Sequence, residues 1–373
     1  MKIIYNLAFL LLFQFFSACD QEVELSLSSP LSDSVQIQKR DNAEVANIVF
    51  KSTDGGQTWL NISEGLPEPV IDGNGAGRND FFADDNGLWL SAGNGIYHNK
   101  PTANTPFWNK EIFPNKHSSI APGKAGIYAY NYGGGGIFQK TKGTGVWSPV
   151  FTNFQEKQVF SVFETSGGTV FICSDRGLFK SANSGKSWKQ LPVGGGGKMI
   201  ESNAVLLVTS EAGILRSTDD GENWALVISE GGVGIDVERI ESGFAAINYS
   251  TAAKTRRIRT SYDGGKTWQP IDAGFPGQAI IDSPWRPMKV DNPAKGNADS
   301  SWHPKEVPLQ PLEYKTSIIQ VGENFFCGHT DGIYRSSDKG KTWKLVRCAE
   351  QGKMFKLYVS GNVIYAIQTE SHC

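Results

Sequence analysis

The chain has 373 residues, of which 39% are hydrophobic, 11% are aromatic and 42 are glycine, and its formal net charge at pH 7 is −2. This near-neutral balance provides no basic surface for a nucleic acid backbone, so nucleic acid is not an expected partner. Long apolar patterns with a period of 3.6 residues are scarce. The composition therefore excludes a mainly helical protein and favours many short strands joined by tight turns.

The first residues have the pattern of an export signal. Lys2 supplies a positive charge, residues 3–16 are almost wholly apolar, and the small residues Ser17 and Ala18 precede Cys19. The apolar stretch is too short for a permanent transmembrane helix. We therefore expect export, with residues 1–18 as a signal peptide.

Residues 16–19 resemble the bacterial lipobox, in which the chain is cut before the cysteine and the new N-terminal cysteine is diacylated. The resemblance implies that Cys19 is the lipid attachment site and that the protein reaches the bacterial envelope as a membrane-anchored lipoprotein, in the outer membrane or periplasm. The alternative is an ordinary secretory signal with an incidental cysteine. Residues 19–46 are polar and serine-rich, which predicts a flexible tether.

A motif of the form Ser-x-Asp-x-Gly-x-Thr-Trp, or a close variant, occurs five times along the chain. The Asp or Asn side chain can accept hydrogen bonds from backbone N–H groups two residues later in the chain, and glycine can adopt the left-handed backbone conformation. Each copy therefore predicts a hairpin turn. We expect the tryptophan to fasten the turn to the strands beneath it. The acidic or amide residue and the tryptophan of each copy are Asp54 and Trp59, Asn183 and Trp188, Asp219 and Trp224, Asp263 and Trp268, and Asp338 and Trp343.

The motif matches the Asp-box, or BNR repeat, of sialidases, sortilin-type receptors and photosystem II assembly propellers. The resemblance implies a β-propeller in which each copy forms the turn between the third and fourth strands of a blade, on the lower outer rim. A single carboxylate per turn cannot supply the six to eight oxygens that calcium requires, so the motif is interpreted as structural. No metal or other cofactor is expected.

Apolar strands precede each motif in the same order, and two further units have lost the motif but keep a tryptophan at its end. These units cover residues 81–112, with Trp108, and residues 118–151, with Trp147. The two chain ends supply only two strands each, and together they complete one more blade. The sequence therefore predicts an all-β, seven-bladed β-propeller of four-stranded blades over residues 47–373, closed by N- and C-terminal strands that share a blade.

Four further cysteines could form disulfides in an oxidising compartment. Cys327 is expected on a second strand and Cys348 just after the fourth strand of the same blade. Two strand spacings are about 10 Å, beyond the Cα separation of about 7 Å that a disulfide tolerates. No disulfide is expected between Cys327 and Cys348, whereas the disulfide status of Cys173 and Cys373 is left open.

Ligands of propellers usually bind at the face opposite these turns, which we call the upper face. A proline-rich insertion loop of about forty residues, 272–313, is predicted there, and a loop of that length is either functional or disordered. Its Trp285 and Trp302 could stack on a sugar ring or hold a peptide, beside Arg286 and His303. Residues at the starts of inner strands, most of them charged, are expected to surround the central channel, an arrangement common in closed propellers, and Lys198 is a further ligand-binding candidate among them. They are Arg78, Asp80, His117, Lys157, Lys198, Asp236, Glu238, Glu313, Tyr314 and Lys315.

Two functions are compatible with this pattern. The first is a non-catalytic binding or assembly scaffold for a glycan or protein partner, monomeric and attached to the membrane only through its lipid. The alternative is an exo-sialidase-like glycoside hydrolase, which needs three arginines on the substrate carboxylate, a tyrosine nucleophile activated by a glutamate, and an aspartic acid-base. The Arg-Ile-Pro motif that supplies the first of these arginines early in sialidase sequences is absent from this chain. The residues that could take these roles are Arg78, Asp80, Arg286, Glu313 and Tyr314.

Overall fold

The computed structural model describes residues 46–67, 80–84, 87–92, 95–99, 107–113, 118–131, 134–156, 158–194, 197–275 and 315–370. The predicted signal peptide, all but the last residue of the tether and most of the insertion loop lie outside them. Every regular element in the described part is a β-strand. Within these residues no helix has the length and apolar character needed to cross a membrane.

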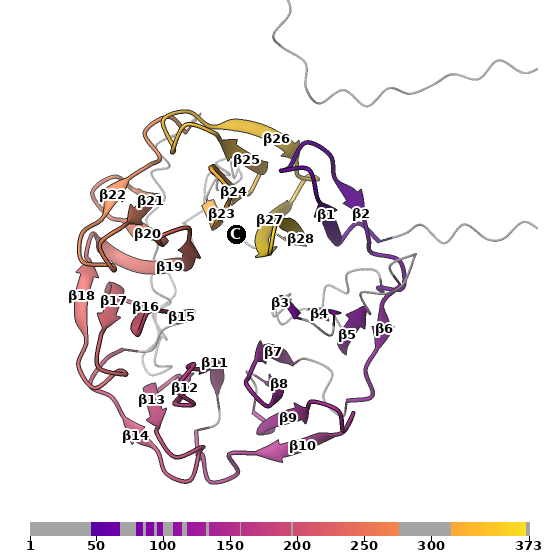
Figure 1. Ribbon diagram of the computed structural model, residues 1–373, viewed down its shortest axis with the longest axis vertical. Coiled ribbons are helices and arrows are strands. Elements are labelled where there is room, and N and C mark those ends of the chain that lie inside the picture. The colour runs from indigo at the N-terminus through magenta and orange to yellow at the C-terminus, as the bar shows by residue number, and fades with distance from the viewer. Residues whose placement is uncertain are drawn as a thin grey trace, which may run out of the picture. The chain divides into compact units, whose positions relative to one another are not determined.

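The strands form seven four-stranded antiparallel sheets arranged as the blades of a ring (Figure 1). This confirms the predicted seven-bladed propeller. The first blade, from its inner strand outward, contains β27 (Lys353–Ser360), β28 (Val363–Glu370), β1 (Val49–Ser52) and β2 (Leu60–Asn61).

The remaining six blades follow the chain in order, each running from its inner strand to its outer one. The second and third contain β3 (Phe81–Asp84), β4 (Gly87–Ala92), β5 (Gly95–Asn99) and β6 (Asn109–Lys110), then β7 (Ser119–Pro122), β8 (Gly126–Tyr130), β9 (Ile137–Thr141) and β10 (Trp147–Val150). The fourth and fifth contain β11 (Val159–Glu164), β12 (Val170–Ser174), β13 (Gly177–Ser181) and β14 (Lys189–Gln190), then β15 (Met199–Ser202), β16 (Val205–Ser210), β17 (Gly213–Ser217) and β18 (Ala225–Ile228). The sixth and seventh contain β19 (Gly231–Ile240), β20 (Gly243–Ser250), β21 (Thr255–Ser261) and β22 (Gln269–Pro270), then β23 (Lys315–Val321), β24 (Asn324–His329), β25 (Gly332–Ser336) and β26 (Lys344–Cys348).

Both chain ends contribute to the first blade, as predicted. Strand β1 pairs antiparallel with β28, with Val49 opposite Ile367 and Ser52 opposite Ile364. The N–H of Gln368 also donates to the carbonyl of Ile48 at 2.7 Å. This pairing converts the open edges of two chain ends into the interior of a sheet, which removes a site for edge-to-edge aggregation.

The apolar core is divided among the junctions between blades. The buried hydrophobic residues form seven clusters, and each cluster combines side chains from two neighbouring blades. At the junction of the fourth and fifth blades, for example, Phe171 and Leu178 pack with Leu206 and Val208. No blade buries its faces alone, so the ring is stabilised by contacts that only the closed arrangement provides.

The five motif copies form turns between the third and fourth strands, with one correction to the expected hydrogen bonds. The Asp or Asn Oδ1 accepts the N–H of the residue four positions on, at 2.9–3.0 Å in every copy, rather than two positions on. The serine hydroxyl bonds this oxygen, and the Ser52 Oγ also accepts the N–H of Gly56 at 2.9 Å. These bonds hold the pKa of Asp219 at about 2, because its carboxylate accepts from the backbone and side chain of Asn223 and from Ser217.

The glycine two residues after the Asp or Asn of each copy brings the turn against the preceding blade. Its φ lies between 78° and 84° in all five copies. A Cβ at Gly221 would lie 2.6 Å from the Phe171 ring, and one at Gly185 would lie 2.1 Å from the Phe151 ring. Only glycine satisfies both the left-handed backbone and this close approach. The turns therefore connect blades in addition to ending strands.

The tryptophan indoles bond to more than the strands beneath them. The Nε1 of Trp108 donates to the carbonyl of Ile62 at 2.6 Å, and that of Trp343 donates to the carbonyl of Ile271 at 2.9 Å. Both acceptors belong to the preceding blade. The Nε1 of Trp224 instead donates to Gly221 of its own turn at 3.0 Å. The expected fastening within a blade is thus only part of the role of these tryptophans.

The cysteines within the described residues are free thiols. Cys327 is buried on β24, and Cys348 ends β26, two strands away. Burial raises the pKa of Cys327 well above its usual value, because the apolar surroundings disfavour the thiolate. Cys327 therefore serves as a small core residue.

Candidate functional site

The inner strands place five titratable side chains near one another around the ring axis. This axial cluster consists of Asp80, Lys198, Asp236, Glu238 and Tyr358. Asp80 directly precedes β3 and Lys198 directly precedes β15, whereas Asp236 and Glu238 lie on β19 and Tyr358 lies on β27. Side chains separated widely in the sequence meet here because the first strand of every blade faces the axis (Figure 1).

Lys198 is the only cation of this cluster. Its Nζ lies 2.8 Å from Asp236 Oδ1 and also bonds the carboxylate of Glu238. The side chain of Asp236 is 6% exposed and that of Lys198 is 36% exposed, so the lysine side chain keeps more contact with solvent than this carboxylate does. The second oxygen of Asp236 accepts the N–H of Ile318 at 3.1 Å, which fixes its orientation against the seventh blade.

Burial and charge set the protonation of the cluster. Burial opposes the ammonium charge, but the charges of Asp236 and Glu238 outweigh it and raise the pKa of Lys198 above its usual value. Burial raises the pKa of Glu238 and the ammonium of Lys198 opposes that rise. Burial and the charge of Asp80 raise the pKa of Tyr358, so its phenol stays protonated.

Asp80 is held through its backbone. Its N–H donates to Ser91 Oγ at 3.0 Å, and its carbonyl accepts the N–H of Ser91 at 2.9 Å. The carboxylate Oδ2 is buried and has no hydrogen-bond partner within the part of the chain that the structure describes. Asp80 thus adds a negative charge beside Tyr358, and the cluster carries more carboxylates than cations.

Lys315 begins an inner strand, as predicted, but it belongs to a different group of side chains. Its Nζ donates to the carbonyl of Arg256 at 3.0 Å and lies 3.9 Å from Asp272. Arg257 binds the same Asp272 carboxylate through Nε and Nη2, at 3.0 Å each. These contacts join the sixth and seventh blades, and burial lowers the pKa of Lys315.

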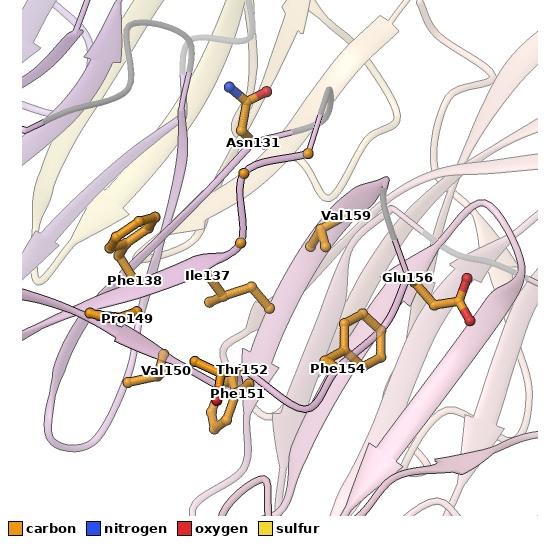
Figure 2. Close-up of a pocket in the computed structure, with 13 residues that line it drawn as sticks. Asn131, Ile137, Phe138, Pro149, Val150, Phe151, Thr152, Phe154, Glu156 and Val159 are labelled. Carbon is orange, nitrogen blue, oxygen red and sulfur yellow. The ribbon is translucent and has the colours of Figure 1, made fainter.

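A cavity of about 400 Å³ opens on the upper face between the third and fourth blades. Its wall comes from the β8–β9 turn and from the connection between β10 and β11, both of which belong to that face. Figure 2 shows Ile137 directed towards Val159 and Phe154, with Asn131 at one end of the cavity. The ring of Phe138 packs against Phe113 of the second blade, with centroids 5.4 Å apart. Residues 134–136, all glycine, contribute bare backbone to the wall.

Several residues expected at the site lie outside the described residues. They are Arg78, His117, Lys157, Trp285, Arg286, Trp302, His303, Glu313 and Tyr314. Of the predicted ligand-binding residues, the structure describes Lys198 and places it in the axial cluster. Within the described residues, no three His, Cys, Asp or Glu side chains gather in a way that could hold a metal ion.

Sequence reasoning missed Tyr358 and the cavity. Tyr358 lies on β27, where the alternation of side chains along a strand predicts only which side of the sheet it occupies. Its nearness to Asp80 depends on closure of the ring. Phe138 and Phe154 resemble ordinary strand and connection residues. The glycine run at residues 133–136 was the available signal, although it predicts only tight turns.

Comparison with solved structures finds several that are similar in fold. It is similar to a GH74 xyloglucanase from Xanthomonas campestris, with a TM-score of 0.55 and 14% identity over 83% of this chain and 53% of that one. It is also similar to a protein described as the extracellular domain of a hybrid two component system from B. thetaiotaomicron, with a TM-score of 0.53 and 9% identity over 83% of this chain and 40% of that one. A third similar structure is YCF48 from Cyanidioschyzon merolae, with a TM-score of 0.50 and 12% identity over 78% of this chain and 94% of that one.

The seven four-stranded sheets define the class of protein, an all-β propeller, and the likenesses agree with this fold. The chain spans only 38% to 42% of the length of three B. thetaiotaomicron extracellular domains that it resembles. Neither a protein-family model nor a curated protein sequence matches it. Identities this low carry the fold alone.

Proposed function

We propose that this protein is an Asp-box propeller of the cell envelope that acts as a non-catalytic binding or assembly scaffold and presents its upper face to a glycan or protein partner. The observation that supports this most directly is the state of the axial cluster. Lys198 is neutralised by two carboxylates, and burial with the charge of Asp80 disfavours ionisation of the Tyr358 phenol. These groups are arranged for stable polar contact rather than for nucleophilic attack.

Two described arginines of the sixth blade also favour binding over sialidase chemistry. A sialidase-type site needs arginines that are free to bind a substrate carboxylate. Arg257 is instead committed to Asp272, and Arg259 is paired with Glu230. Neither guanidinium is available without breaking an internal ion pair.

A glycoside hydrolase is the alternative, and one feature favours it. Asp236 and Glu238 bind the same ammonium group, and burial raises the pKa of Glu238. A carboxyl group with a raised pKa beside an ionised one is the pairing that glycosidases use. The roles of Arg78, Arg286, Glu313 and Tyr314 in a sialidase-like site remain part of this alternative.

Turnover of a panel of fluorogenic glycosides, including a sialoside, separates the two functions. We expect no release of fluorophore above the protein-free rate. Turnover that is lost in Glu238→Gln or Tyr314→Phe, but kept in the lower-rim control Tyr262→Phe, would establish the hydrolase. Crosslinking in the native host provides the binding measurement, and a partner that is captured by the full chain and lost on deleting residues 283–312 would support the scaffold.

We also propose that Cys19 carries the lipid anchor, on the strength of residues 16–19. Metabolic labelling with a clickable fatty acid should mark the protein in a bacterial host. Cys19→Ser should lose the label and leave the membrane fraction, whereas the control Cys348→Ser should keep both. Equal labelling of the two variants would place the lipid elsewhere.

A further inference from the structure

We propose that the cavity between the third and fourth blades binds a neutral sugar ring. This inference rests on the proposed binding function and gives it a ligand class and a place. The cavity measures about 400 Å³, near the lower end of the range of about 300 to 1,000 Å³ that small-molecule sites occupy. That volume suits one or two rings, and it is too small for a folded partner.

The apolar part of the wall suits the C–H face of a pyranose. The ring of Phe154 forms part of the wall, and Ile137 and Val159 contribute aliphatic surface beside it (Figure 2). An aromatic ring can contact one face of a flat, partly apolar ligand. A ligand without an apolar face would leave these side chains exposed to water.

The polar part of the wall can both donate and accept hydrogen bonds. It consists of the amide of Asn131, the hydroxyl of Thr152 and the peptide groups of the glycines at 134–136. Amides and hydroxyls share this dual capacity with sugar hydroxyls, and carboxylates or ammonium groups do not. A purely apolar ligand would desolvate these groups without replacing their hydrogen bonds, which costs free energy.

The charge of the described wall disfavours acidic sugars. Glu156 is the one charged residue in the lining within the part of the chain that the structure describes, and its carboxylate lies 3.3 Å from Arg176 Nε outside the cavity. Figure 2 shows this carboxylate directed away from the cavity centre. Among the described residues, no lysine or arginine lines the cavity to compensate a ligand carboxylate, so sialic and uronic acids should bind worse than neutral sugars.

The aromatic walls are held in place before any ligand arrives. Phe151 adopts a φ of 54°, which is uncommon for an aromatic residue, and it packs against Trp188 with ring centroids 5.4 Å apart. Phe154 packs against Trp188 at 5.0 Å and Phe179 at 5.2 Å. A preformed wall reduces the conformational entropy lost on binding. This favours the binding of sugars, whose affinities are weak.

A peptide side chain is the competing occupant. An apolar side chain of a peptide would contact the apolar part of the wall. Its atoms could not form hydrogen bonds with the polar part. The sugar matches both halves of the wall at once, and for this reason we assign it. The two ligand classes can be told apart with soluble probes.

The experiment measures binding of glucose, galactose, mannose and their disaccharides to the full chain by ligand-observed NMR, which detects weak complexes. We expect at least one neutral sugar to bind, and N-acetylneuraminic acid to bind at least about tenfold more weakly. Thr152→Trp should fill the cavity from an exposed position and weaken binding by about tenfold or more. The control is Gln155→Trp, which adds the same side chain at an exposed neighbour outside the lining.

Asn131→Ala tests the polar wall separately and should weaken binding by about fivefold to tenfold. Melting temperatures of all variants check that the fold survives. Sugar binding that Thr152→Trp leaves unchanged, or preferential binding of a tyrosine- or leucine-containing tetrapeptide, would overturn the assignment. If no sugar binds but deletion of residues 283–312 still removes a crosslinked partner, this inference fails and the proposed scaffold function stands.

Discussion

Gly56 of the first blade lies against the ring of Phe326 of the seventh, so closely that a Cβ on the glycine would be 2.6 Å from Phe326 Cε1. This contact crosses the junction where the chain ends meet. The preceding residue, Gly55, also has a left-handed backbone but has no atom within 4 Å of a Cβ position. Substitution of Gly55 therefore tests backbone strain alone, whereas substitution of Gly56 tests backbone strain together with a steric clash.

Gly56→Ala should lower the free energy of unfolding by about 2 to 4 kcal/mol, because it combines an unfavourable φ of 78° with a clash against Phe326. Gly55→Asp should cost about 1 kcal/mol or less, since the matching residue of another copy is Asp220 with a φ of 56°. Urea unfolding of both variants measures the difference. Equal losses would mean that the contact with Phe326 contributes nothing.

Glu111 should make stability depend on acid pH. Its side chain is 7% exposed, and although burial raises its pKa, hydrogen bonds from His98 and Lys140 outweigh this and hold the pKa at about 2. The unfolded chain binds this proton near pH 4.5, so the stabilisation is complete above that pH and is lost as pH falls towards 2. A shift of this size corresponds to roughly 3 kcal/mol.

Urea unfolding of the wild type and Glu111→Gln at pH 7, 4.5 and 3 tests this effect. The wild type should lose more free energy of unfolding between pH 4.5 and 3 than the variant does. Parallel pH profiles for the two proteins would show that Glu111 is not the responsible carboxylate. The exposed Glu211→Gln is the control, and it should follow the wild type.

Lys198→Met should destabilise the protein at neutral pH more than at acid pH. The substitution leaves Asp236 and Glu238 buried beside each other without their cation. We expect a loss of about 1 to 3 kcal/mol at pH 7, below the cost for a fully buried pair because Lys198 keeps 36% exposure. Protonation of Glu238 should relieve the repulsion, so a deficit that grows between pH 7 and 5 would contradict the arrangement.

Removing residues 355–373 should prevent formation of a stable monomer. The deletion removes most of β27 and all of β28, and it leaves β1 paired only with the two-residue strand β2. We expect aggregation or unfolding on size-exclusion chromatography and loss of the cooperative thermal transition. A truncated chain that stays monomeric with its melting temperature intact would refute closure by the shared blade.

The sequence by itself determined the blade count, the closure and the position of the turns. Each depends on short-range chemistry: a serine, an aspartate and a glycine within five residues define a turn such as that from Ser52 to Gly56, and alternation of apolar residues defines the strands between turns. Counting such units and noticing that the ends were incomplete was enough to predict the seven blades that the structure contains.

Only the tertiary structure decided which side chains meet across blades. The pairing of Lys198 with Asp236, the bond from Trp108 to Ile62, and the cavity between the third and fourth blades each join residues from different blades or connections. Their distances depend on how each sheet twists and packs on the next, and no local pattern in the chain carries that information. Local hydrogen bonds repeat within every unit, whereas the contacts that define a binding site are made once, between units, when the ring closes.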